Sequence, residues 1–320
     1  MQSEIVETVY SLLPRKQVVY RATHNGNRIY YTVDPTGEPT LYLSLTTMIK
    51  ATCPTSDHLI KWIAEMGYDA AKKYSAERAD YGSLMHILFG KYIVDKFYDF
   101  DKTEEICKSF PQYKYKDEWL EELNKDVAGF MQFVVDRNVK PLAVELVLVS
   151  EDGYGTLCDL ICEMDVEVDG LDHENPYKSG VRKGQPREVK QTQRITALIN
   201  FKSGRKGFYE THEIQLEFER RLFEENFPEI KIGGIFNLSP TDWRTTPSYK
   251  LKDQSDSLEK EKADAILAIA KIELMKKIPT YTSISGKVTF GGLPMITSKT
   301  LMDEIREAHK VEEIFSDARP

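Results

Sequence analysis

Gly155-Thr156-Leu157-Cys158-Asp159-Leu160-Ile161 is a short apolar run that carries one carboxylate, and Ile199-Asn200-Phe201-Lys202-Ser203-Gly204 is a second that carries one amine. Such runs are typical of buried strands. An aspartate at the end of one strand and a lysine on the next suit a divalent-metal site for phosphodiester hydrolysis. Position 200, where a second carboxylate would complete the pattern, is Asn. Whether the protein cuts nucleic acid or only binds it therefore depends largely on this amide.

The composition is that of a soluble globular protein, long enough for one large domain or two modest ones. The 320 residues are 41% hydrophobic and 29% charged, with a net charge of −8. No apolar run approaches the roughly 20 residues that span a bilayer, and the acidic N-terminus differs from a signal peptide. The four cysteines lack the spacing of a metal site, so we expect reduced thiols in a cytoplasmic protein with no membrane partner.

Positive charge is concentrated in one segment, although the chain as a whole is acidic. Between residues 178 and 194 there are six Lys and Arg side chains against one acid, Glu188, and three more follow by residue 206. A solvated hairpin tip would explain such a run, but its closeness to the two strands favours contact with a phosphate backbone. The residues that we expect to contact nucleic acid are Lys183, Arg187, Lys190, Arg194, Arg205 and Lys206.

Hydrophobic periodicity predicts a mixed α/β protein whose sheet lies between helices. Segment 17–33 alternates polar and apolar residues around Asn25-Gly26, which predicts a β-hairpin. Helical patterning begins near Ser56, which could cap a helix, and a polar insertion at 169–193 separates two core strands. We expect further helices at 69–79, 83–97, 118–136, 212–226, 255–277 and 298–315, and strands at 40–45, 142–149, 156–163, 194–202 and 231–238.

Five side chains in these elements are candidates for chemistry. Asp159 lies among apolar residues, where a carboxylate is costly unless it binds a cation or a donor. Lys202 could orient an attacking hydroxide and offset charge on a phosphorane, although a surface lysine is commoner. His86 offers an imidazole, which suits Mn²⁺. Glu145 and Gln215 lie either in the same site or on the open faces of their elements.

The order and spacing of these motifs resemble the PD-(D/E)XK nuclease superfamily, and within it the RecB-like branch that includes phage-type exonucleases. The resemblance covers residues 44–240, and the joint spacing is more specific than any one motif. The matching motifs are Ser44-Leu45-Thr46-Thr47-Met48-Ile49, Leu59-x-x-Trp62 with Gly67, Gly82-Ser83-x-x-His86, Glu145, Gly155-Thr156-x-x-Asp159, Asn200-x-Lys202-Ser203-Gly204 and Gln215.

The resemblance implies a restriction-endonuclease-like core, with a central mixed β-sheet flanked by helices. An N-terminal hairpin and helices at 1–140 and the core at 141–250 would form one nuclease-like domain, followed by a helical C-terminal extension at 251–320. It also implies metal-assisted phosphodiester hydrolysis with Mg²⁺ or Mn²⁺. The implied metal ligands are His86, Asp159, Asn200 and the backbone carbonyl of Phe201, with Lys202 positioning the attacking water and Glu145 and Gln215 completing the site.

Two residues depart from the family pattern. Asn200 replaces an acid, which removes a negative charge and should weaken the binding of a hard dication. Glu219 stands where the helix motif Q-x-x-x-Y has Tyr. Asn200 is either an engineered substitution, or natural with a carboxylate supplied from elsewhere, or a mark of a protein that binds DNA without cutting it. The candidate replacement carboxylates are Glu145, Glu163, Glu217 and Glu219.

Our first hypothesis is a metal-dependent DNA exonuclease that serves recombination, repair or phage DNA metabolism. Its partners would be double-stranded ends or single strands of DNA and a recombination or replication protein, in a bacterial or phage-infected cell. The alternative is a non-catalytic nucleic-acid-binding or assembly protein that keeps the fold. Acidic net charge and charged C-terminal helices make a protein partner plausible.

Overall fold

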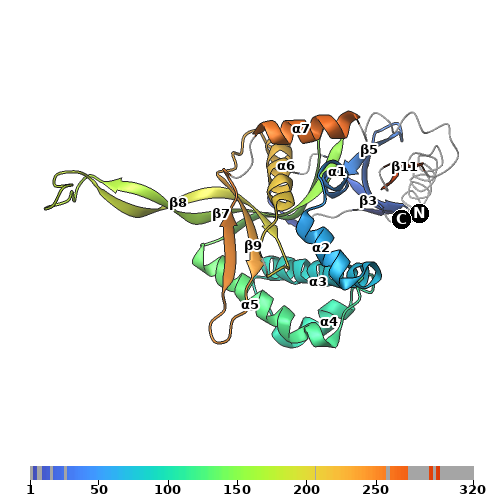
Figure 1. The fold of residues 1–320 in the computed structure, drawn as a ribbon, viewed down its shortest axis with the longest axis horizontal. Coiled ribbons are helices and arrows are strands. Elements are labelled where there is room, and N and C mark those ends of the chain that lie inside the picture. Colours follow the sequence, from blue (N-terminus) through green and yellow to red (C-terminus); the bar gives the residue numbers. More distant parts are fainter. Residues whose placement is uncertain are drawn as a thin grey trace, which may run out of the picture.

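The computed structural model describes residues 3–5, 9–14, 17–24, 27–205, 207–256, 260–272, 288–290 and 293–295. A ten-stranded mixed sheet forms its centre, and helices cover both faces (Figure 1). This confirms the expected mixed α/β architecture. The strand order is β1 (Ser3–Ile5), β3 (Tyr20–His24), β4 (Asn27–Val33), β5 (Pro39–Ser44), β7 (Tyr154–Asp172), β8 (Arg187–Phe201), β9 (Gly234–Pro240) and β10 (Tyr249–Asp253), while β6 (Lys140–Val149) pairs with β7 and with β2 (Tyr10–Ser11).

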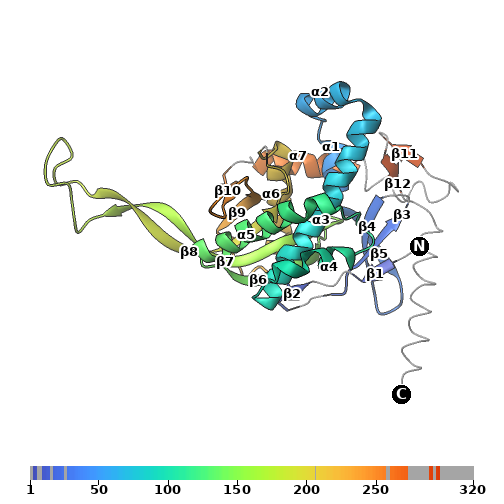
Figure 2. The same ribbon diagram turned by 90° about the horizontal axis from the view of Figure 1, so that it is seen from below.

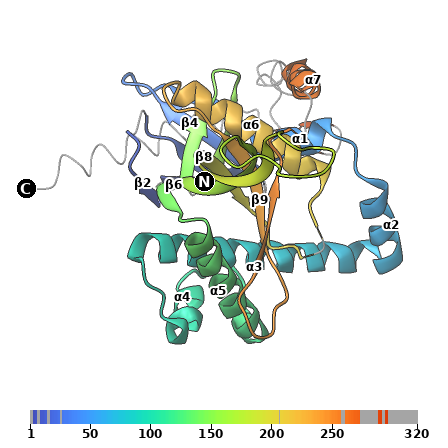
Figure 3. The ribbon, with the colours of Figure 1, turned by 90° about the vertical axis from the view of Figure 1, so that its left-hand side faces the viewer.

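Two hydrophobic cores lie on the two faces of this sheet. Neighbouring strand residues point to opposite faces, so Leu198 packs in one core and Ile199 in the other. No described helix is long and apolar enough to cross a membrane. One face carries α1 (Leu45–Thr52), α6 (Glu210–Asn226) and α7 (Lys260–Ala270), and the other carries α3 (Tyr68–Asp95), α4 (Thr103–Lys108) and α5 (Leu120–Asp136) with the short 3-10 turns η1 (Phe100–Lys102) and η2 (Asp117–Trp119) (Figure 3).

The centre of the sheet follows the predicted order of elements. Strands β6, β7 and β8 are antiparallel to one another, and β9 lies parallel to β8 after a crossover through α6. Parallel neighbours require a long connection of this kind. The predicted hairpin at 17–33 is confirmed by the antiparallel pair β3–β4, in which His24 lies opposite Asn27. The predicted strand at 40–45 corresponds to β5.

A fork opens between β7 and β8 at Leu160 and Ile199, which form the last pair of their shared ladder. Before Leu160, β7 has β5 beside it instead, and beyond Ile199, β8 continues beside β9. Asp159 and Asn200 are therefore the first residues past the fork on their two strands. The topology alone brings these two sequence-predicted side chains to one place.

In the other direction, β7 and β8 continue beyond the body as a two-stranded arm (Figure 2). The ladder runs out to the pair Asp172–Arg187, so the predicted polar insertion at 169–193 is wrong at its two ends, 169–172 and 187–193, which are strand. Residues 173–186 form the turn at the tip. Segment 187–193 is almost wholly exposed, so it lacks the apolar pattern by which we identified the buried strands.

Helix α3 also differs from the prediction of two helices at 69–79 and 83–97, because one continuous helix runs from Tyr68 to Asp95. Gly82, which lies between the two predicted helices, is helical. A Cβ there would lie 3.2 Å from Ser203 Oγ, so the missing side chain lets the chain after Lys202 approach the helix. Helix α2 (Asp57–Met66) begins as predicted, with the Ser56 side chain accepting a hydrogen bond from the Leu59 amide.

The expected boundary at residue 250 falls inside β10, which pairs with β9, so the first described residues after it belong to the main sheet. Helix α7 packs into the core of the main body through Ala263, Ile266 and Ala270. A small hairpin, β11 (Val288–Phe290) with β12 (Leu293–Met295), lies where only irregular structure was expected. The predicted helix at 298–315 lies outside the described residues.

Two helical glycines provide a test of the packing. A Cβ on Gly129 of α5 would lie 2.6 Å from the backbone oxygen of Ser248, whereas one on Gly90 of α3 would meet Val144 at an ordinary 3.6 Å. Gly129→Ala should therefore lower the free energy of unfolding by about 1–3 kcal/mol through overpacking. Gly90→Ala, the matched control, should be neutral or stabilising by up to about 1 kcal/mol. Urea denaturation measures both, and equal effects would contradict this packing.

Candidate metal centre

Three side chains converge beside the fork, each from a different element. His86 on α3 has its Nδ1 atom 3.3 Å from Glu145 Oε1 on β6 and 3.7 Å from Asp159 Oδ1 on β7. One potential ligand atom from each residue lies within 4.8 Å of the other two. Among the described residues this is the one His, Cys, Asp and Glu group with such a geometry. The structure thus brings three of the predicted site residues, His86, Glu145 and Asp159, into one group.

A local irregularity in both strands presents the two carboxylates. On β6, Val144 and Leu146 are two residues apart yet pack in opposite cores, and Glu145 between them has a left-handed φ of 50°. On β7, Cys158 and Leu160 lie on either side of Asp159 and likewise pack in opposite cores. Non-glycine residues rarely adopt such a φ, and departures from regular strand geometry commonly re-aim side chains at functional sites.

The backbone of Phe201 closes the fork. Its N–H donates a 2.6 Å hydrogen bond to Asp159 Oδ2, and its ring contacts the His86 ring edge to face at a centroid distance of 5.4 Å. Asp159 is 6% exposed, so this bond also satisfies a nearly buried carboxylate oxygen. The expected metal ligation by the Phe201 carbonyl stays a prediction, since the contact with Asp159 is made by the Phe201 amide.

A second group of side chains lies under α6 on the other side of the fork. The Asn200 amide donates to both carboxylate oxygens of Glu219, at 3.2 and 3.1 Å. Gln215 Nε2 donates to Glu219 Oε1 at 2.7 Å, and Gln215 Oε1 accepts from Lys202 Nζ at 3.0 Å. Asn200 and Lys202 point to the same face of β8, and Gln215 and Glu219 are one turn apart on α6. These four residues therefore form one hydrogen-bonded chain.

Burial and mutual repulsion shape the charges of the site. Burial, with further repulsion from Glu145, raises the pKa of Asp159 to about 6 despite the attraction of His86. Burial and the neighbouring Asp159 raise the pKa of Glu219 to about 8. Burial alone would lower the pKa of His86, but the attraction of Asp159 and Glu145 outweighs it and raises that pKa to about 9. The acids are thus harder to ionise than usual, which a bound cation would reverse.

The basic side of the site is Lys202. Burial lowers the pKa of its amine, against the opposing attraction of Asp159 and Glu219. Burial of the nearby His212, together with repulsion from Lys202, lowers the pKa of His212 to about 3. His212 therefore stays neutral at ordinary pH and adds no competing charge to the site.

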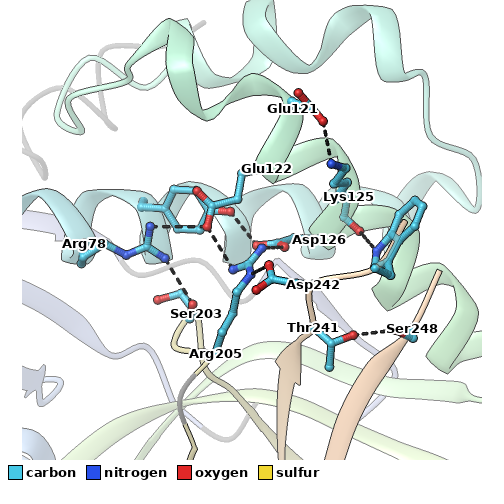
Figure 4. Close-up of polar contacts among 12 residues, drawn as sticks. Arg78, Glu121, Glu122, Lys125, Asp126, Ser203, Arg205, Thr241, Asp242 and Ser248 are labelled. Atoms are coloured by element: carbon cyan, nitrogen blue, oxygen red, sulfur yellow. Dashed lines mark hydrogen bonds and ion pairs between the residues drawn. The ribbon is translucent and has the colours of Figure 1, made fainter. Parts of the chain in front are cut away.

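The segment after Lys202 is fixed by an ion-pair cluster (Figure 4). Arg205 contacts the carboxylates of Asp126, Glu122 and Asp242, and Arg78 donates to the Ser203 carbonyl at 3.2 Å. Asp126 is itself buried at 1% exposure, so Arg205 provides its charge partner. We expected Arg205 to contact nucleic acid, and the structure instead gives it three carboxylate partners.

The other predicted nucleic-acid contacts lie on the arm. Lys190 forms an ion pair with Asp169, and Arg194 pairs with Asp165 at 2.9 Å. These acids on β7 oppose the basic residues of β8 across the ladder, a pairing that the charge count along one strand does not reveal. Lys183 and Arg187 lie exposed near the tip, where Arg187 is 5.8 Å from the Tyr177 ring centroid. Lys206 lies outside the described residues.

The structure also separates the candidate replacement carboxylates. Glu145 joins the His86 cluster and Glu219 joins Asn200, whereas Glu217 forms ion pairs with Arg220 and Arg221. Glu163 lies 3.6 Å from Arg194 at the base of the arm. Glu219 was absent from our set of site residues. The signal that could have identified it is its position four residues after Gln215 on one helix face.

The donor set fits a divalent cation. One imidazole and two carboxylates offer one nitrogen and at least two oxygen ligands, and the two acids are held close despite their repulsion. Mg²⁺ prefers oxygen ligands, while Mn²⁺ accepts nitrogen as well, so the set favours Mn²⁺. His86, Glu145 and Asp159 are therefore the residues that would hold the metal, with the Asn200 amide oxygen as a further candidate.

Comparison with known proteins gives no further assignment. No protein-family model matches the chain, and no curated protein matches its sequence.

Metal binding at this cluster should depend on pH through His86. Its pKa of about 9 means that the ring carries a proton at neutral pH, which a metal must displace. We expect Mn²⁺ affinity to rise about tenfold per pH unit between neutrality and that pKa, and then to level off. Calorimetric titration over this range measures the slope. His86→Gln should bind weakly and lose the slope, and an unchanged slope in that variant would contradict the assignment.

Proposed function

We propose that the protein is a divalent-metal-dependent deoxyribonuclease of the PD-(D/E)XK type. The observation that carries the proposal is the fork, where the His86–Glu145–Asp159 group lies beside the strand that bears Asn200 and Lys202. Two carboxylates on neighbouring strands with an imidazole from α3, and a partly buried lysine just past the end of the next strand, are the groups that metal-assisted phosphodiester hydrolysis requires. An exonuclease action on DNA ends rests on the sequence resemblance to RecB-like enzymes.

The topology supports the same proposal. A helix packs behind three antiparallel strands, and a second helix leads to a fourth strand parallel to the third. In the restriction-endonuclease-like core that we infer from this order, the site lies where the second and third strands separate. The fork at Leu160 and Ile199 is that point.

Each residue of the site has a role in this chemistry. Divalent-metal chemistry here would activate water and neutralise charge on the phosphate. Lys202 has its Nζ held by Gln215 Oε1, which leaves N–H bonds to offset charge developing on a phosphoryl oxygen. Asp159 is held at Oδ1 by His86 and at Oδ2 by the Phe201 amide, and Glu145 contacts His86 in turn. Water would attack phosphorus directly while the ester P–O bond breaks, so no covalent enzyme intermediate is needed, and the displaced alkoxide would take a proton from solvent.

The arm provides a surface for the DNA partner. Its tip, residues 173–187, carries four Lys and Arg side chains and one acid. The shaft, residues 165–172 and 188–194, carries two Lys and Arg side chains and five acids. A cationic tip attracts a phosphate backbone, and a two-stranded ribbon is narrow enough to enter the major groove. We therefore assign DNA contact to the tip rather than to the ion-paired shaft.

A nuclease assay tests the function directly. The unmodified protein should degrade linear double-stranded or single-stranded DNA with Mn²⁺, and more slowly with Mg²⁺. Asp159→Ala removes a ligand and Lys202→Ala removes the amine, and each should lower the rate by at least about a hundredfold. End-labelled linear DNA compared with circular DNA shows whether digestion starts from ends.

Glu163→Ala is the matched control, since it removes a carboxylate four residues along the same strand and outside the site. It should leave the rate nearly unchanged. The alternative function, DNA binding or assembly without cleavage, is favoured by the amide at position 200. DNA binding without any cleavage, in the unmodified protein and in Asn200→Asp, would support that alternative and overturn the enzyme proposal.

The salt dependence of DNA binding tests the assignment to the tip. Within the described chain, no carboxylate forms an ion pair with Lys178 or Lys183, so both are available to phosphates. Replacing both by Gln should weaken duplex binding and reduce the slope of log K against log salt by up to about 2. Fluorescence anisotropy with a labelled duplex measures the slope. Replacing Lys190 and Arg194 by Gln should change it less, and the reverse ranking would contradict the assignment.

A further inference from the structure

The amide at position 200 has one partner that fixes its orientation. Glu219 is fully buried and Asn200 is 1% exposed, so neither group is free to bond with bulk water. Two amide nitrogens donate to Glu219: Nδ2 of Asn200 lies 3.2 and 3.1 Å from its two oxygens, and Nε2 of Gln215 lies 2.7 Å from Oε1. Both oxygens of Glu219 therefore act as acceptors in this arrangement.

The carboxylate determines which end of the amide faces α6. An amide has a donor end and an acceptor end, and since both oxygens of Glu219 accept here, the NH₂ end of Asn200 is the end that faces them. With Nδ2 turned to Glu219, the Oδ1 atom of Asn200 lies on the other side of the amide. Hard cations bind the oxygen of an amide and not its nitrogen, so this orientation is the one that metal ligation requires.

No other described residue takes over this task. Asn237 on β9 lies beside Asn200 in the parallel register and is fully buried. Its two amide atoms have no hydrogen-bond partner within the described chain, so it does not hold Asn200 in either orientation. The orientation of Asn200 therefore depends on Glu219.

The pocket also has room for only one such charge. A carboxylate at position 200 would place its oxygen where Nδ2 now is, 3.1–3.2 Å from both oxygens of Glu219. Two ionised carboxylates at that distance in a buried site repel strongly. An acid at 219 with an amide at 200, or an acid at 200 with an amide at 219, each keep one charge and one hydrogen-bonded pair.

We propose that Glu219 is a positioning residue of the metal centre: it turns the Asn200 oxygen toward the ligand side and, ionised once a cation is bound, supplies the negative charge that position 200 lacks. This inference rests on the proposed function and deepens it. In this proposal the site keeps its second acid, which lies on α6 at position 219 instead of on β8 at position 200, and the two positions are joined by a hydrogen bond. A purely structural Glu219 would stabilise the contact between α6 and β8 and nothing more.

The test is a double-substitution cycle read by Mn²⁺ affinity and by thermal unfolding of the metal-free protein. Glu219→Gln should lower Mn²⁺ affinity at least about tenfold, because it removes the charge and frees the amide to turn. Adding Asn200→Asp to that variant should restore most of the affinity, because the exchange regains one acid and one amide. Asn200→Asp alone should lower the melting temperature, and the double variant should recover it.

Glu217→Gln is the control on the same helix, since its carboxylate pairs with Arg220 and Arg221 away from the site. It should lower the melting temperature and leave Mn²⁺ affinity unchanged. The inference is overturned if Glu219→Gln affects only stability, or if Asn200→Asp changes affinity equally with Glu and with Gln at 219. Asp159→Ala separates a failure of this inference from a failure of the proposed function. If Asp159→Ala abolishes Mn²⁺ binding while the effects of Glu219→Gln and Asn200→Asp on Mn²⁺ affinity simply add, only the inference about Glu219 fails. If the unmodified protein binds no Mn²⁺, the proposed function fails with it.

Discussion

The hydrogen bond from the Phe201 amide to Asp159 Oδ2 is the contact on which the rest of the site depends. It spans the fork where the ladder between β7 and β8 has just ended, at a donor–acceptor distance of 2.6 Å. On one side it orients Asp159 toward His86 and Glu145, and on the other it fixes the backbone between Asn200 and Lys202. The Phe201 ring packs in the core with Phe89 and Phe130, so the bond is anchored to rigid structure. One backbone amide thus sets the spacing between the carboxylate cluster and the lysine.

The site holds more buried acid than base, which has an energetic consequence. Asp159, Glu145 and Glu219 face His86 and Lys202, and the pKa values of Asp159 and Glu219 are raised to about 6 and about 8. Carboxylates kept close against their own repulsion are costly for a protein without a ligand. A divalent cation supplies the missing positive charge and would make the same arrangement favourable. The arrangement is therefore easier to explain as a cation site than as a structural feature.

The sequence was sufficient where the signal was local. Asp159 and Lys202 each interrupt an apolar strand, and the spacing of Gly82 and His86 lies within one helix, so these residues could be identified without a structure. Glu219 could not be assigned in this way, because its contact with Asn200 depends on how α6 crosses β8. At Glu145 the strand β6 changes the face of the sheet to which its apolar side chains point. This change requires a left-handed backbone conformation, which no hydrophobic pattern predicts. Arg205 resembled a phosphate ligand because the sequence does not show that three acids surround it.

The arm adds a geometric constraint on any bound DNA. Its ladder contains thirteen pairs from Leu160–Ile199 to Asp172–Arg187, and at about 3.3 Å per residue the tip lies up to about 40 Å from the fork. That span is close to one turn of a duplex, which is about 34–36 Å. The shaft between them is acidic and repels phosphates, while the tip is basic and attracts them. Under the proposed function, a duplex bound at the tip would therefore place another phosphate of its backbone, about one helical turn away, near the fork.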